Sequence, residues 1–95
     1  MDVRFLVDRD TGLPHIYGHG VNELEVLELL RNRHEDAPGR EGTRIAEGQT
    51  LAGRYLRVIY RLNELDHSIL VITGYDLAGK ARKAFLRRRR RRRGQ

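Results

Sequence analysis

With 95 residues and a mass of 11.1 kDa, the chain has room for one small domain, which excludes a two-domain enzyme. It contains no cysteine, so a disulfide scaffold, zinc held by thiolates and thiol catalysis are excluded. No apolar run approaches the roughly 20 residues that cross a bilayer, and the first residues lack the pattern of a secretory signal. We therefore expect a soluble, cytoplasmic protein with no membrane partner.

The positive charge of the chain gathers at its C-terminal end. The net charge is +6, from 19 basic and 13 acidic residues. Ten of the basic residues lie in the last 16 positions, where there is no acid, so residues 1–79 carry a charge of −4. Like charges at i, i+4 disfavour a helix. The sequence therefore predicts one acidic domain over residues 1–86 and an arginine-rich, disordered tail over residues 87–95.

The first part of the chain predicts a short strand and a helix. Residues 3–7 are rich in β-prone side chains and end in a turn-rich cluster. Asn22 opens a helix that runs to about residue 33 or 34, because Asn is a favoured N-cap and Glu25, three positions on, completes a capping box. Leucines and valines occupy most of the circumference of this helix, which is wider than an ordinary core-facing stripe. The helix is therefore either covered on more than one side or meets another chain.

The second part predicts a β meander and a final helix. Residues 35–42 contain Pro and Gly and indicate a loop. Apolar spacing at i, i+3 and i+4 after Asp76 predicts a short amphipathic helix. The order β-α-β-β-β-α is typical of the α+β class, with a small antiparallel sheet of about four strands and two helices packed on it. The three strands of the meander are expected over residues 43–50, 54–62 and 68–75.

Several short motifs resemble the BrnT-type toxins and their small relatives in the RelE superfamily. The similarity covers roughly residues 5–86 and begins with Phe-Leu-Val-Asp at 5–8, followed by His-Gly-Val at 19–21 and an acidic helix. Gly53-Arg54 resembles the turn between the two central strands of that family, and Val-Ile-Thr-Gly-Tyr at 71–75 resembles a final strand. The resemblance implies a RelE-like fold, cleavage of RNA on or off the ribosome, and a cognate antitoxin protein.

RNA cleavage without a metal needs a base for the 2′-hydroxyl, cations for the phosphate and an acid for the leaving oxygen. Arg57 and Arg61 share one face of the strand over residues 54–62, and Tyr75 ends the neighbouring strand. We expect these three residues, with His19 of the His-Gly-Val motif, to form the catalytic site. Two alternatives stay open: the arginines form a solvated face paired with acids, and His19 fixes the entry of the helix.

Neither a cofactor nor a metal is expected. The glycines are too dispersed for a phosphate-cradling loop. His15 and His19 are four positions apart, but no third ligand accompanies them.

The basic residues near the C-terminus predict contact with RNA or the ribosome, because arginine and lysine neutralise backbone phosphates without reading sequence. An acidic protein partner or a solubilising tail remain alternatives. The expected nucleic-acid-binding residues are Arg54, Lys80, Arg82, Lys83, Arg87, Arg88, Arg89, Arg90, Arg91, Arg92 and Arg93.

Three functional hypotheses follow. The first is a metal-independent endoribonuclease, the toxin component of a type II toxin–antitoxin pair. The second is a non-catalytic RelE-like module that binds nucleic acid or protein. It is favoured by the loss of charged residues of the family, since Gly18, Leu70, Gly74-Tyr75 and Ala81 occupy the positions of its Lys, Arg, Ser-Ala-Arg and Glu. The third is a self-associating protein, a homodimer formed through the wide apolar arc of the first helix.

Overall fold

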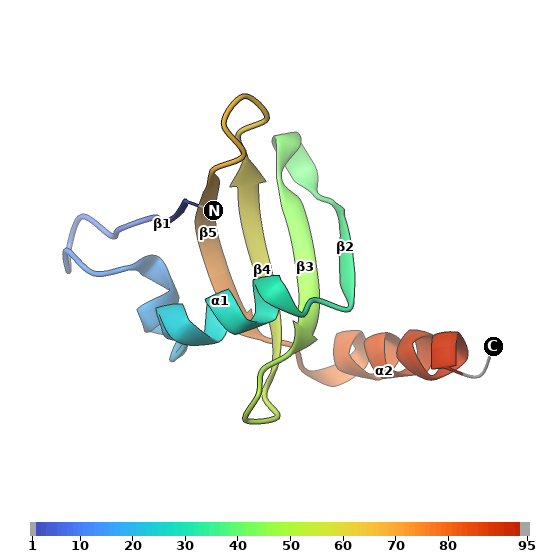
Figure 1. Ribbon diagram of the computed structural model, residues 1–95. Coiled ribbons are helices and arrows are strands. Elements are labelled where there is room, and N and C mark those ends of the chain that lie inside the picture. The colour runs from blue at the N-terminus through green and yellow to red at the C-terminus, as the bar shows by residue number, and fades with distance from the viewer. Residues whose placement is uncertain (1, 94–95) are drawn as a thin grey trace.

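The strand with the clearest alternation in the sequence, β4, occupies the centre of a five-stranded sheet (Figure 1). The computed structural model describes residues 2–93. The strands lie in the order β1-β5-β4-β3-β2, and the predicted α+β class is confirmed. In chain order the elements are β1 (Val3–Phe5), the 3-10 helix η1 (His15–His19), α1 (Glu23–Arg31), β2 (Glu35–Pro38), the 3-10 helix η2 (Arg40–Gly42), β3 (Arg44–Gln49), β4 (Tyr55–Leu62), β5 (Ile69–Asp76) and α2 (Gly79–Arg93).

The sheet corrects two expectations, its strand count and its all-antiparallel pairing. It has five strands instead of about four, because Glu35–Pro38, expected as part of a loop, pairs antiparallel with β3. As the edge strand β2 it has a free side, where a proline that lacks an N–H is tolerated. β1 runs parallel to its neighbour β5, so the sheet is mixed. A long connection containing α1 separates these two strands, as a parallel pair requires.

The main core lies between α1 and one face of the sheet. Figure 1 shows α1 crossing that face. Alternation along β4 places Leu56 and Val58 in this core with no exposed surface, where they meet Val26 and Leu29 of α1. Gly48 of β3 lies against the segment that follows α1, since a Cβ atom there would sit 3.4 Å from the Cα atom of Arg33, in van der Waals contact.

The start of α1 forms as predicted. The Asn22 side chain accepts a hydrogen bond from the Glu25 N–H at 2.9 Å, and the Glu25 carboxylate accepts one from the Asn22 N–H at 3.1 Å. This capping box satisfies two backbone donors that a helix start otherwise leaves open. The helix ends at Arg31, two or three residues before the predicted end. On its outer side Leu24 is 66% exposed, and the expectation that this side meets another chain stays a prediction.

The second helix packs on the opposite face of the sheet and is longer than predicted. Its single buried anchor among residues 79–92 is Phe85, whose ring lies 6.1 Å from the ring of Tyr55 and 6.0 Å from that of His34. Figure 1 shows α2 extending beyond the β2 edge. The helix continues to Arg93, whereas a disordered tail was expected from residue 87. The remaining positions of that expected tail, 94 and 95, lie outside the described residues.

Carboxylates on the sheet explain why the arginine run is helical. Arg88 donates to Glu35 at 2.7 and 2.9 Å and to Glu47 at 3.3 Å, and Arg92 donates to Glu35 at 2.9 Å. These contacts offset the repulsion between neighbouring arginines, which was the only effect considered when the tail was predicted to be disordered. No helix among the described residues combines the length and the apolar character needed to span a bilayer.

Candidate nucleic-acid interface

Three of the predicted catalytic side chains follow one another: Arg57 and Tyr75 lie on the sheet face opposite α1, and His19 of η1 lies beside Tyr75. The register places Arg57 of β4 directly across from Tyr75 of β5. The ring of His19, at the end of η1, lies 5.9 Å from the ring of Tyr75 in an edge-to-face arrangement. On the other side of β4, Glu47 of β3 stands opposite Arg57. The row His19, Tyr75, Arg57 and Glu47 therefore runs across four elements, η1, β5, β4 and β3, and is called the sheet row below.

The guanidinium of Arg57 keeps its positive charge in this row. Its Nε–H donates to the Glu47 carboxylate at 2.6 Å. Burial disfavours the charge, but hydrogen bonds to Tyr75 and Glu47 outweigh burial, and the pKa of Arg57 lies above its ordinary value. Arg57 is therefore suited to bracing a phosphate and unsuited to accepting a proton.

His19 is an exposed side chain at the end of a turn with a fixed geometry. Gly20, in the left-handed region with φ of 70°, ends η1 directly after it. The neighbouring His15 lies 5.4 Å from His19, ring to ring, and its Nδ1 is 2.9 Å from Oδ1 of Asp8. Within residues 2–93, no group of three or more acidic or histidine side chains is placed to hold a metal ion. The His19 side chain therefore stands at the end of the sheet row, where it is exposed to solvent.

Arg61 lies apart from the other three predicted catalytic residues. It is on the same face of β4 as Arg57 but four residues further on, which is about 13 Å along a strand. Its Nη1 donates to the backbone carbonyl of Glu41 at 2.6 Å, and its partner in β5 is Leu70. Arg61 therefore holds the loop at η2 and does not join the sheet row.

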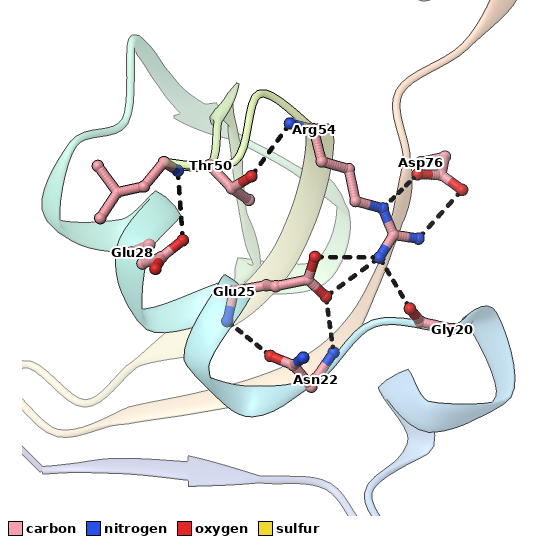
Figure 2. Close-up of polar contacts among 8 residues, drawn as sticks. Gly20, Asn22, Glu25, Glu28, Thr50, Arg54 and Asp76 are labelled. Carbon is pink, nitrogen blue, oxygen red and sulfur yellow. Dashed lines mark hydrogen bonds and ion pairs between the residues drawn. The ribbon is translucent and has the colours of Figure 1, made fainter.

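Arg54, expected to bind nucleic acid, is occupied by contacts within the fold (Figure 2). Its Nε donates to Asp76 at 2.7 Å, and its Nη1 donates to the Gly20 carbonyl at 2.8 Å and to Glu25 at 3.1 Å. The hydrogen bond to Asp76 is the largest cause of a pKa well above the ordinary value for arginine. One guanidinium thus links the end of β5, the turn before α1 and the capping box of α1.

We expect the substitution Arg54→Lys to lower the free energy of unfolding by about 1–2 kcal/mol, because an ammonium keeps the charge but does not reproduce the fork of donors. Urea unfolding followed by circular dichroism measures the change. The matched control is Arg61→Lys, an exposed arginine with one carbonyl partner, where a loss of less than about 0.5 kcal/mol is expected. Equal losses in the two variants would contradict the linking role of Arg54.

The basic side chains of α2 fall into a paired set and a free set. In the paired set, Arg88 and Arg92 contact carboxylates as described above, Arg89 donates to Gln49 at 3.1 Å, and the Arg82 guanidinium lies 4.4 Å from the centre of the Tyr55 ring. In the free set, every side chain is exposed and no carboxylate of residues 2–93 lies within ion-pair distance. The free set is Lys80, Lys83, Arg87, Arg90 and Arg91.

Two glutamates that sequence reasoning missed organise this interface. Glu47 is only 6% exposed and joins Arg57 of the sheet row to Arg88 of α2. Glu35 receives Arg88 and Arg92; the hydrogen bond from Arg88 is the largest cause that lowers the pKa of its carboxyl group, against burial, which raises it. The one signal in the sequence was Glu47 itself, an acid inside a predicted strand.

Comparison of the chain with models of protein families, with curated proteins and with solved structures found no match in any of the three, so its function has to be inferred from this geometry.

Proposed function

We propose that this protein is an endoribonuclease of the RelE and BrnT type, the toxin of a toxin–antitoxin pair, and that the sheet row is its active site. The observation that supports the proposal most directly is the series His19, Tyr75 and Arg57, three side chains from separate elements in which Tyr75 lies beside each of the other two. These residue types supply the three roles that metal-independent cleavage of RNA requires. The RelE-like fold itself remains part of the proposal.

The reaction proposed is transfer of the phosphate to the neighbouring 2′-oxygen. His19 accepts the proton of the 2′-hydroxyl, because histidine exchanges protons near neutral pH. The 2′-oxygen bonds to phosphorus, and the bond from phosphorus to the 5′-oxygen breaks. Tyr75 gives its hydroxyl proton to that oxygen, and Arg57 stabilises the negative charge on the phosphate and on the tyrosine oxygen. The products are a 2′,3′-cyclic phosphate and a 5′-hydroxyl.

Cleavage of a single-stranded RNA by the purified chain tests the proposal, with the cyclic phosphate identified by mass spectrometry. We expect His19→Gln and Arg57→Gln each to reduce the rate by about 10²-fold or more, the range typical of a lost acid–base or charge-stabilising group. Arg61→Gln is the matched control on the same strand face and is expected to retain the parent rate. The proposal fails if the parent does not cleave, or if His19→Gln and Arg57→Gln cleave as the parent does.

The cognate antitoxin is the partner that the family resemblance implies. Expression of the chain alone is expected to arrest growth, and a short reading frame for a DNA-binding protein beside its gene is expected to relieve the arrest. Growth unaffected by the parent protein would count against the toxin assignment.

A non-catalytic nucleic-acid-binding module is the second candidate function. The observation that favours it is the pairing of Arg57 with Glu47, which already uses part of the charge that the phosphate would need. The free set of α2 supplies cations that carry no such partner. Binding of RNA without any cleavage product would select this second function over the first.

A further inference from the structure

The two sets of basic residues on α2 occupy different sides of the helix. At 3.6 residues per turn, Lys80, Lys83, Arg87, Arg90 and Arg91 fall within an arc of about 100°. Arg88 and Arg92 lie outside this arc, on the side that carries the buried Phe85. The arginine run is therefore not a uniform charge: one side attaches the helix to the sheet, and the other is free.

The free side is a continuous stripe of one charge on a rigid element. It spans about 16 Å along the helix axis, from Lys80 to Arg91, at 1.5 Å per residue. Four pairs within it stand three or four positions apart, and each pair of like charges costs roughly 0.2–0.5 kcal/mol of helix stability. A polyanion laid along the stripe would relieve that repulsion and would find the cations already held in place.

We propose that this stripe, Lys80, Lys83, Arg87, Arg90 and Arg91, binds the phosphate backbone of RNA, while Arg88 and Arg92 dock the helix and make no contact with the ligand. The proposal deepens the proposed function, since it names the surface that holds the RNA, but it concerns binding and does not need cleavage. Because the stripe binds backbone phosphates and not bases, we expect α2 to contribute no base preference.

The salt dependence of binding measures how many cations of α2 neutralise phosphates. For single strands the slope of log K against log salt is about −0.7 per neutralised phosphate. Five free cations predict a slope of about −3.5, whereas all ten basic residues of the last 16 positions would predict about −7. A slope near the first value would show that only the free side of α2 binds RNA, and a slope near the second would show a uniformly basic tail.

Two double variants with the same net charge test whether the free stripe and the docking arginines have different roles. Fluorescence anisotropy with a labelled 16-nucleotide oligouridine is measured over a series of KCl concentrations for the full chain. Arg87→Gln with Arg91→Gln removes two free cations, and we expect the slope to become shallower by about 1.4 and the affinity near 0.1 M salt to fall about 25-fold. The thermal midpoint of this variant is expected to match that of the parent protein.

The matched control is Arg88→Gln with Arg92→Gln, which shifts the same change by one position along the helix. It is expected to lower the thermal midpoint, because Glu35 and Glu47 lose their partners, and to leave the slope unaltered. If this double variant does not fold, Arg92→Gln alone, at a more exposed arginine, serves in its place.

Three outcomes would overturn the proposal. Equal changes of slope in the two variants would show a uniform tail. If the parent protein did not bind oligouridine at low salt, RNA would be excluded as the ligand of the stripe. Tighter binding to polyglutamate than to oligouridine would identify an acidic protein as the partner instead. A chain that binds with the expected slopes but does not cleave would refute the ribonuclease and leave this inference standing.

Discussion

Replacement of Glu47 by glutamine is expected to lower the stability of the fold and, at the same time, to raise its affinity for RNA. The Glu47 carboxylate is almost fully buried and receives Arg57 at 2.6 Å and Arg88 at 3.3 Å. Loss of one member of a buried ion pair costs about 3–5 kcal/mol, and the partial exposure of both arginines reduces the expected loss to about 2 kcal/mol. The same change releases Arg57 to a phosphate.

The gain in affinity is expected to be about five-fold near 0.1 M salt, the value for one additional cation at a single strand. Urea unfolding measures the loss of stability, and oligouridine anisotropy measures the gain. Glu35→Gln is the matched control, since it removes the same charge beside Arg88 but does not contact Arg57. Adding Arg57→Gln should abolish the gain in the Glu47 variant only. A gain that persists without Arg57 would show a general effect of net charge.

Local patterns in the sequence were sufficient where one element determines the outcome. The capping box at Asn22 and Glu25 depends on residues three positions apart, and both of its hydrogen bonds form as predicted. The alternation of β4 likewise fixes which side chains face α1, because one face of that strand is buried. Both features follow from spacing within a few residues of chain.

The features that the sequence did not predict come from contacts between distant segments. Glu35–Pro38 has no apolar alternation and contains a proline, and it becomes a strand only because β3 offers it an edge. Repulsion within the arginine run predicted disorder, but Glu35 lies 53 positions before Arg88 and stabilises the helix from the sheet. In both cases tertiary pairing overrides a local preference.

The same distinction applies to the candidate site. Alternation placed Arg57 and Arg61 on one face, which the structure shows, but only the strand register decides which of them meets Tyr75. The register is not uniform, since Ile59 pairs with Thr73 and Tyr60 with Val71. A shift of this kind cannot be deduced from the residues of β5 alone. Nor does any spacing in the sequence bring His19 to Tyr75, because that contact depends on where η1 meets the sheet.

Truncation of Phe85 to alanine is expected to have the largest effect on stability of any change in α2. Phe85 has no exposed surface and is the one buried side chain among residues 79–92. Truncation of a buried phenylalanine to alanine costs about 3–5 kcal/mol, and we expect a loss of about 3 kcal/mol here, because the change also removes the ring contacts to Tyr55 and His34. Urea unfolding measures this loss, and Leu86→Ala, at the half-buried next position, should cost about 1 kcal/mol.

Detachment of α2 would also change how the chain binds RNA. Without the anchor, Arg88 and Arg92 leave Glu35 and Glu47, and the repulsion that these carboxylates offset then disfavours the helix. The helical signal in circular dichroism should fall, and the salt slope should steepen from about −3.5 towards about −7, because the docking arginines become free to meet phosphates. If the Phe85→Ala protein loses stability but keeps the parent slope, the carboxylates alone hold α2 in place. Arg88 and Arg92 would then still be docked on the sheet, and only the free set would meet phosphates.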